Sequence, residues 1–314
     1  MYIDTITKGI RLANKNWKLL LVQFVLMIST CAGFVLLIGI PLAVAFVFFG
    51  VDLVAAKNIL QMLNDPMNIV SKYLGLVIFI LSFVLLYITL VSIIGIFTLG
   101  GTIGVLRNSI NDNVYTFSVA SFIKEGKRLF VPLMWLTLII GIILISVFFV
   151  FGVIGGGAIS ATSYLKGRST PIALFIGTFL SILVIILGAV SFLAVFAFSI
   201  FSIVILAVEE SKPIAAIKKT YRFLSATTKA FVFYLILFCC YIAAAVVVLL
   251  IGYPFSLIPI VGPLLNLPYQ IISYVIYSYL NLVLFASMAV FYLENRGSTC
   301  PQAEGLTHEV PVSG

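Results

Sequence analysis

Long stretches without a single charge decide the fold, and the first of them, Leu19–Val47, reads LLLVQFVLMISTCAGFVLLIGIPLAVAFV. A helix of about 20 apolar residues crosses the hydrocarbon core of a bilayer, so this stretch is long enough to span it. It is also about twice as long as the apolar part of a secretory signal peptide. We therefore expect a retained first transmembrane helix.

The whole chain has the composition of a protein that crosses a membrane several times. Of its 314 residues, 63% are hydrophobic and 9% are charged, and the mean hydropathy is +1.27. Soluble domains carry about 25% charged residues, which excludes a soluble globule of this size. We expect an all-α bundle of six spans, which lie approximately at Leu19–Val47, Val70–Leu99, Leu129–Phe151, Pro171–Val208, Phe231–Ile251 and Leu264–Leu293.

The basic residues alternate with the spans and predict the topology. If the N-terminus, the connections 100–128 and 209–230 and the C-terminal tail share one side, that side holds fourteen of the eighteen Lys and Arg residues. The positive-inside rule places such a side in the cytoplasm. We expect both termini to be cytoplasmic, with residues 1–297 forming one polytopic membrane domain and 298–314 a flexible tail.

A pattern of apolar and basic residues recurs along the chain. Its first copy comprises Ile3, Ile6, Lys8, Ile10, Arg11 and Lys18, and a shift of 211 residues finds Ile214, Ile217, Lys219, Tyr221, Arg222 and Lys229. A shift of 116 residues matches four positions, Val119, Phe122, Lys124 and Lys127, but not Gly126 and Met134. We predict three parallel units, near 1–112, 113–210 and 211–297, each an amphipathic interfacial helix followed by a transmembrane hairpin.

The residues of this pattern form an apolar stripe and a basic stripe at helical spacing. Such helices lie flat at a membrane surface, with the apolar stripe toward the acyl chains and the basic stripe toward anionic headgroups. Clusters of this kind suit lipid better than nucleic acid, which needs an extended soluble basic face. The predicted headgroup contacts are Lys8, Arg11, Lys124, Lys127, Lys219 and Arg222. The alternative is that these residues only flank the cytoplasmic ends of the spans.

The sequence offers no catalytic, cofactor or metal site. All ten acidic and all eighteen basic residues lie outside the cores of the six spans, whereas pumps and intramembrane hydrolases place an ionisable residue inside the membrane. The single histidine, His308, lies in the polar tail, so a catalytic Ser or Cys would lack a base. The four cysteines show no metal-ligand spacing. We expect a protein that is not an enzyme.

Polar residues spaced by three and four form a face on the last span. They are Gln270, Ser273, Tyr274, Tyr277, Ser278 and Asn281. Each polar group needs a partner in hydrocarbon, so we expect this face to turn toward the bundle. Three roles are open for this face. It forms hydrogen bonds to other helices, it lines a cavity for a lipid or another weakly charged solute, or it binds a partner protein.

Two segments resemble a known family. They are Pro213–Leu224, which reads PIAAIKKTYRFL and precedes a transmembrane pair, and Val290–Gly297, which reads VFYLENRG. Together they resemble the membrane domain attached to some prokaryotic glycerophosphoryl diester phosphodiesterases, and its stand-alone relatives. The resemblance implies an integral membrane module with no catalytic residue. Together with the absence of N-glycosylation sequons, it favours a prokaryotic cytoplasmic membrane.

Two functions are compatible with these features. The first is a non-enzymatic membrane protein that organises lipid, or a membrane protein partner, at the cytoplasmic face. The second is a transporter or flippase for a lipid-like or weakly charged solute, which would use the polar face of the last span.

Overall fold

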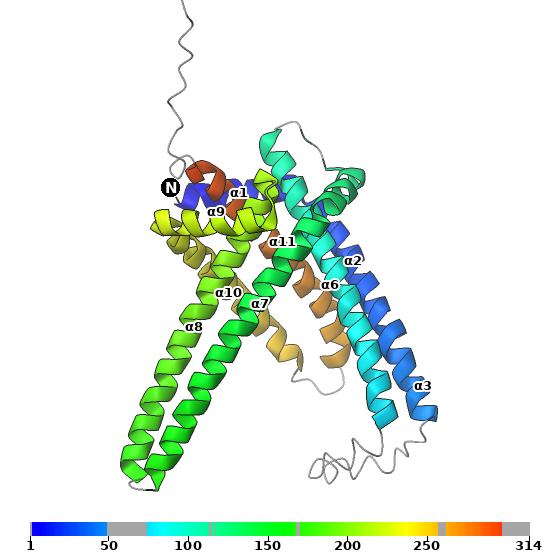
Figure 1. The fold of residues 1–314 in the computed structure, drawn as a ribbon. Helices are drawn as coiled ribbons and strands as arrows, with labels where there is room; N and C mark the ends of the chain where they lie inside the picture. Colours follow the sequence, from blue (N-terminus) through cyan, green and yellow to red (C-terminus); the bar gives the residue numbers. More distant parts are fainter. Residues whose placement is uncertain are drawn as a thin grey trace, which may run out of the picture. The chain divides into compact units, whose positions relative to one another are not determined.

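The computed structural model describes residues 2–48, 74–112, 115, 117–167, 170–256 and 262–296. Every regular element within these ranges is a helix (Figure 1). The elements are α1 (Tyr2–Lys15), α2 (Lys18–Phe34), the π-helical turn η1 (Val35–Gly39), α3 (Ile40–Phe48), α6 (Leu74–Asn111), α7 (Val119–Lys166), α8 (Thr170–Glu209), α9 (Pro213–Ala226), α10 (Thr228–Ser256) and α11 (Gly262–Asn295). The tail 298–314, including His308, lies outside the described residues.

Among the described residues, six helical stretches are long and apolar enough to cross a membrane, and each overlaps one of the six expected spans. This confirms the all-α, multi-pass class. The first span contains the turn η1, in which the Ile40 N–H donates to the carbonyl of Val35, five residues back. Pro41 follows this turn and has no N–H to continue the α-helical pattern, which favours a widened turn there.

Two of the three predicted interfacial helices are separate elements. Helices α1 and α9 have 14 residues each, and α9 begins at Pro213, where a proline fits the first helical turn. The middle segment differs, because it forms the start of α7 and continues into the span without a break. Thr227 leaves the helical conformation after α9, whereas the residues between Val119 and Pro132 include no such interruption.

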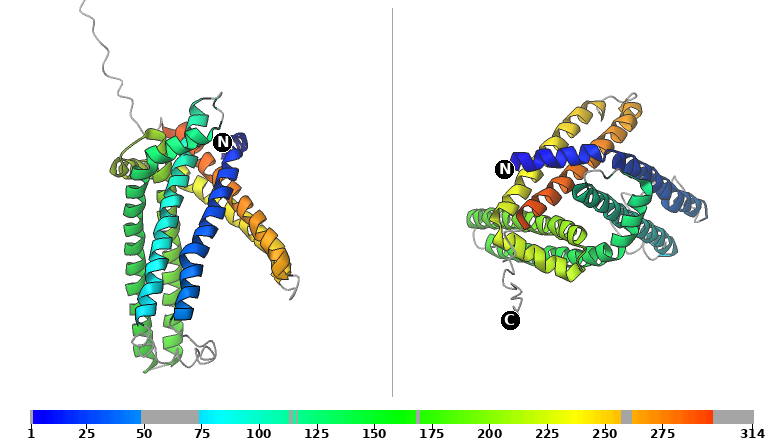
Figure 2. Two further views of the ribbon diagram at one scale, coloured as in Figure 1. Left: turned by 90° about the vertical axis from the view of Figure 1, so that its right-hand side faces the viewer. Right: turned by 90° about the horizontal axis from the view of Figure 1, so that it is seen from above.

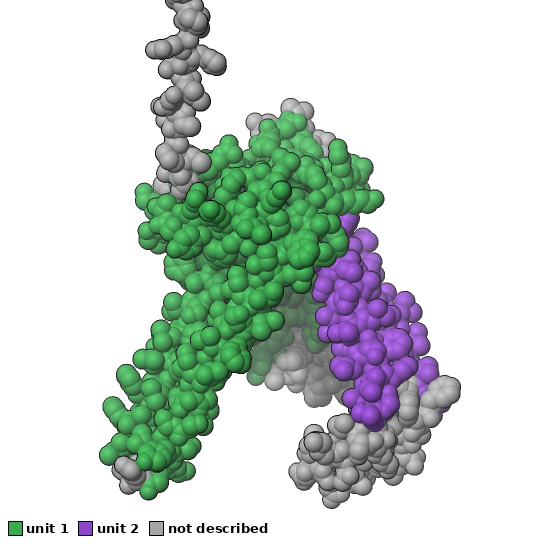
Figure 3. All heavy atoms as spheres, in the orientation of Figure 1, with its two compact units in different colours: residues 1–16, 100–314 green, residues 17–99 purple. Residues whose placement is uncertain are grey.

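The helices form two compact units, which Figure 3 colours separately. The smaller unit comprises residues 17–99, with α2, η1, α3 and the first part of α6. Within it, the rings of Phe34 and Tyr87 meet edge to face with centroids 5.5 Å apart. Gly33 lies opposite Leu90, so α2 and α6 pack through side chains at this level.

The larger unit comprises residues 1–16 and 100–314, and it carries the candidate site. Within this unit, α7 and α8 run side by side as one hairpin, and α10 and α11 form a second (Figure 2). Helix α1 packs against α11, and α9 packs against α8. We call the basic end of this unit the place that contains α1, α9, the last turns of α6, α8 and α11, the first turns of α7 and α10, and the residues that connect them.

The core of the larger unit is concentrated at the basic end. The buried rings of Phe233 and Phe291 stack with centroids 4.3 Å apart, and Phe201 packs on Phe223 at 5.4 Å. Farther along the spans, large apolar side chains such as Phe149 are exposed. Apolar side chains lose nothing by facing lipid tails, so a membrane span needs little protein packing outside such a core.

Candidate functional site

The basic end of the larger unit carries a large excess of positive charge. Among its described residues, thirteen Lys and Arg stand against six Asp and Glu. An excess of this kind attracts anionic groups, above all anionic lipid at a membrane surface. Which cations are accessible depends on how the six carboxylates pair.

Helix α1 presents three different faces. Its buried face consists of small residues, Thr5, Gly9 and Ala13. About 100° around the helix lies the apolar stripe, where Ile3 is 79% exposed. The basic stripe with Arg11 lies about 120° away on the other side. This helix therefore binds the protein by one face and leaves both the apolar and the basic stripes open.

The small face lets α1 approach α11 very closely. A Cβ atom added at Gly9 would lie 2.7 Å from the Cα atom of Ser287, which is closer than real Cβ atoms come. Only glycine fits this position without moving one of the two helices. The contact fixes the position along α11 at which α1 crosses it.

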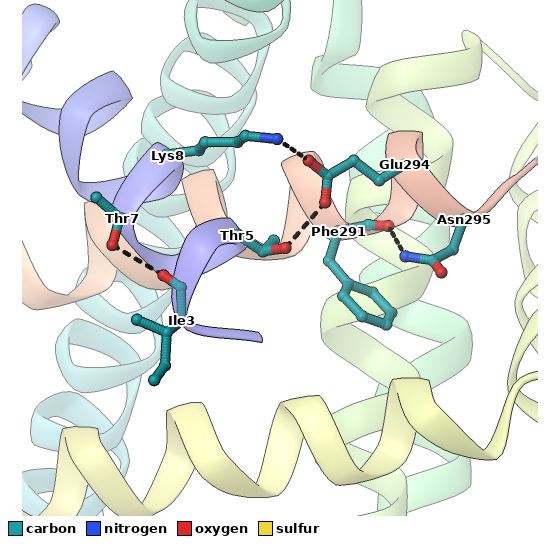
Figure 4. A network of polar contacts seen from close by, with 7 residues as sticks. All are labelled: Ile3, Thr5, Thr7, Lys8, Phe291, Glu294 and Asn295. Atoms are coloured by element: carbon teal, nitrogen blue, oxygen red, sulfur yellow. Dashed lines mark hydrogen bonds and ion pairs between the residues drawn. The ribbon is translucent and has the colours of Figure 1, made fainter. Parts of the chain in front are cut away.

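Polar contacts hold α1 in this place (Figure 4). Thr5 Oγ1 donates a hydrogen bond to Glu294 Oε2 at 2.9 Å, and Lys8 Nζ donates to Glu294 Oε1 at 2.5 Å. The hydrogen bond and the negative charge of Glu294 raise the pKa of the Lys8 amine above its ordinary value. Lys8 is thus an anchor of α1 on α11.

Helix α9 is held on α8 by the same kind of contact. Lys219 forms an ion pair with Glu209 at the end of α8, and Tyr292 also donates to that carboxylate. Ser202 Oγ donates to Thr220 Oγ1 at 3.1 Å on the buried face of α9. Lys219 is thus the anchor of α9.

These two sets of contacts match in register. Lys219 lies 211 residues after Lys8, and its partner Glu209 lies 85 residues before Glu294. The same two shifts relate the pair Thr220–Ser202 to the pair Gly9–Ser287. In both cases an amphipathic helix packs on the last turns of a preceding span. The match supports the predicted repeat, which remains a prediction.

The middle segment packs in a similar way but carries different charges. A Cβ atom at Gly104 of α6 would lie 2.5 Å from the Cβ atom of Glu125, which stands 116 residues after Gly9. Asn108 Nδ2 donates to Glu125 Oε1 at 3.2 Å. Glu294 follows Ser287 by seven residues in α11, and the residue that follows Gly104 by seven in α6 is Asn111. Lys124 therefore has no equivalent of the Lys8 ion pair.

Two arginines and two carboxylates form a network beside this contact. Arg128 pairs with the buried Glu125, and its Nη1 atom lies 3.2 Å from Glu210 Oε1. Arg107, at the end of α6, pairs with the same Glu210 carboxylate. The network joins α6, α7 and the residue after α8, and its charges cancel.

The six predicted headgroup residues thus fall into two groups. Lys8 and Lys219 form ion pairs that hold their helices. The other four are exposed, and no described carboxylate lies within ion-pair distance of their side chains; they are Arg11, Lys124, Lys127 and Arg222.

A hollow of about 670 Å³ lies between α1 and the last turns of α6 and α11. Its lining residues are Lys8, Arg11, Leu12, Lys15, Ser109, Ile110, Val290, Leu293 and Glu294. It therefore combines the basic stripe of α1 with apolar side chains of three helices.

The structure divides the polar face of the last span. Ser273 and Ser278 are buried, Tyr277 Oη donates to the Ala245 carbonyl of α10 at 3.5 Å, and Tyr274 is half-buried, whereas Gln270 and Asn281 are exposed. A cavity of about 400 Å³ between α10 and α11 is lined by Leu249, Gly252, Tyr253, Tyr269, Ser273 and Tyr277.

Sequence reasoning missed the acidic half of the site. Glu209 lies at the end of α8 and Glu294 in the last turn of α11, and their spacing of 85 residues was the signal that could have identified them. The Arg107–Glu210 pair had no comparable signal, because neither residue belongs to the repeated pattern.

Within the described ranges, no group of three or more His, Cys, Asp or Glu residues could hold a metal ion. Comparison with known proteins finds no matching family model, no matching curated protein and no matching solved structure. The chain is, on its structure, a polytopic membrane protein, with six apolar spans in the part that the structure describes.

Proposed function

We propose that this protein is a non-enzymatic membrane module that binds anionic lipid headgroups with its basic end, on the cytoplasmic side. The observation that carries the proposal is the group of four cations without an acidic partner, Arg11, Lys124, Lys127 and Arg222. They come from all three amphipathic segments, so the positive surface extends across the unit.

The neighbouring apolar side chains support the same proposal. Ile3 on α1, Ile123 on α7 and Ile214 on α9 are 79%, 41% and 74% exposed. Each lies on the same helix as one of the unpaired cations, about a quarter-turn or more away from it. A segment with adjoining apolar and basic stripes binds a membrane surface by both acyl-chain and headgroup contacts.

Charge reversal of the four cations tests this proposal. The full chain, with Arg11, Lys124, Lys127 and Arg222 all changed to Glu, is extracted into nanodiscs from a membrane of mixed lipids. Native mass spectrometry then measures the ratio of anionic to zwitterionic lipid that accompanies the protein. The control variant is Lys166→Glu, an exposed lysine at the opposite end of α7.

Each lysine or arginine near an anionic surface contributes about 1 kcal/mol of attraction, so the quadruple variant should lose most of the enrichment. Lys166→Glu should retain it. An unchanged lipid ratio in a folded quadruple variant would refute the proposal. Co-purification of a stoichiometric protein in place of enriched lipid would favour the partner-organising function instead.

A second function, the movement of a lipid-like solute, is favoured by the cavity between α10 and α11. Ser273 and Tyr277 line this cavity, whereas Gln270 and Asn281 do not. If the lipid-like solute passes through this cavity, the double variant Ser273→Val with Tyr277→Phe should abolish lipid flux in liposomes. Gln270→Leu with Asn281→Leu should preserve it. Equal flux in both double variants would exclude this function.

A further inference from the structure

We propose that the hollow between α1, α6 and α11 is a discrete site for one anionic phospholipid, whose phosphate is bound by Arg11. This inference rests on the proposed function and adds to it a defined stoichiometry, position and ligand chemistry. The occupant is an amphiphile, because the hollow offers a charged part and an apolar part side by side.

The charged part of the hollow suits a phosphate. Arg11, Lys8 and Lys15 line it together with a single carboxylate, Glu294, and that carboxylate is already bonded to Lys8 and Thr5. The guanidinium of Arg11 has no acidic partner among the described residues. A planar guanidinium matches two phosphate oxygens at once, which a lysine cannot do.

A buried hydroxyl adds a directional contact. Ser109 at the end of α6 is 3% exposed and lines the hollow. Its Oγ atom accepts a hydrogen bond from Asn16 Nδ2 at 3.0 Å. A serine hydroxyl both accepts and donates, so this arrangement leaves the O–H hydrogen for an acceptor on the ligand.

The apolar part and the size favour a lipid over a free anion. Leu12, Val290 and Leu293 contribute aliphatic surface. The volume of about 670 Å³ lies in the range of about 300–1,000 Å³ that is usual for sites of small organic ligands. An isolated phosphate ion would leave this aliphatic surface uncovered, whereas the glycerol and upper acyl carbons of a lipid cover it.

The corresponding place on α9 is closed, which makes the site specific to α1. Position 12 corresponds to Phe223, and position 11 to Arg222. The ring of Phe223 is 2% exposed and packs against Phe201 and Tyr292. Arg222 thus has the charge of Arg11 but stands beside a filled interior, and it provides a matched control within the same chain.

The test uses the full chain in nanodiscs of phosphatidylcholine with a minority of phosphatidylglycerol. Native mass spectrometry under increasing activation counts the phosphatidylglycerol molecules that remain bound. The variants are Leu12→Phe, which fills the hollow without changing any charge, and Arg11→Gln, which removes the guanidinium on the exposed surface. Arg222→Gln is the control, and thermal unfolding checks that each variant folds.

We expect one tightly retained phosphatidylglycerol in the unmodified protein and in Arg222→Gln. Its occupancy should fall about tenfold or more in Arg11→Gln, because a charge-assisted bidentate contact is lost. Leu12→Phe should abolish it while leaving the overall enrichment of anionic lipid intact. That combination separates the site from general attraction to the basic end.

Three outcomes would overturn the inference. If Leu12→Phe and Arg11→Gln both retain the lipid as strongly as the unmodified protein does, the bound lipid lies elsewhere, even if anionic lipid is still enriched. Loss of the lipid on addition of inorganic phosphate alone would show that the site takes a free anion. No enrichment of anionic lipid in the unmodified protein would instead refute the proposed function itself, and with it this site.

Discussion

Replacing Gly9 by alanine tests whether α1 is held in contact with α11. The new Cβ atom would lie 2.7 Å from Ser287 Cα and 2.8 Å from Ser287 Cβ. A backbone atom cannot rotate away from such an overlap, so α1 has to move off α11. Thr5 would then lose its 2.9 Å hydrogen bond to Glu294.

The magnitude follows from three contributions. Overpacking of a tight contact costs about 1–3 kcal/mol, and the hydrogen bond to a carboxylate contributes about 1.5–3 kcal/mol. One movement of α1 relieves the steric clash and breaks the hydrogen bond. The two costs therefore do not add, and together they amount to about 2–3 kcal/mol. Alanine regains about 1 kcal/mol through its higher helix propensity. The docking of α1 should therefore weaken by about 1–2 kcal/mol, or about 5- to 30-fold.

Hydrogen exchange of the α1 amides in nanodiscs measures this loss, because exchange of a docked helix depends on its opening equilibrium. Gly141→Ala in α7 is the matched control, since a Cβ atom there meets nothing within 4 Å. In the Gly141→Ala variant, the α1 amides should exchange as in the unmodified protein. Unchanged protection of α1 in the Gly9 variant, or equal loss in both variants, would refute the close contact.

Three further predictions concern the basic end. Lys8→Glu should increase exchange of α1, and adding Glu294→Lys should restore protection, because opposite charges face each other again; a double variant no better than the single one would exclude the pair. In a chain without the native cysteines, an impermeant thiol reagent should modify Lys124→Cys only from the cytoplasmic side and Lys166→Cys only from the opposite side; the reverse pattern would invert the topology. Because the pKa of Lys8 is raised above its ordinary 10.5, the stability that its ion pair contributes is complete below that pH and is lost above the raised value. The emission of Trp17, recorded with Trp135→Phe, should thus stay constant to about pH 10 and change only at higher pH, whereas a change near neutral pH would contradict this.

The spans were predictable because their signal is local. Leu19–Val47 and the five other apolar stretches each carry enough uncharged length to identify a membrane helix without any neighbour. The helical period likewise placed Ile3 and Ile10 on one stripe, and the structure leaves both exposed. The exception was the segment after Val119, where periodicity alone could not tell a separate helix from the first turns of α7.

Which cations form ion pairs and which remain accessible was not predictable from any single segment. Lys8 and Arg11 share one stripe, yet Lys8 meets a carboxylate 286 residues away and Arg11 meets none among the described residues. The corresponding Lys219 meets Glu209, whereas Lys124 forms no ion pair with a described carboxylate, and α6 has Asn111 at the position that corresponds to Glu294. A repeated basic pattern therefore contains anchoring and accessible members.

The sequence by itself determined the class of the protein, the positions of its spans and the two stripes of α1 and α9, because hydropathy and helical periodicity belong to contiguous residues. Only the tertiary structure decided which lysines hold the helices in place and which cations remain open. It also decided that a hollow exists beside Leu12 and is closed beside Phe223. These properties depend on close approaches, such as that of Gly9 to Ser287, between residues that are far apart in the chain.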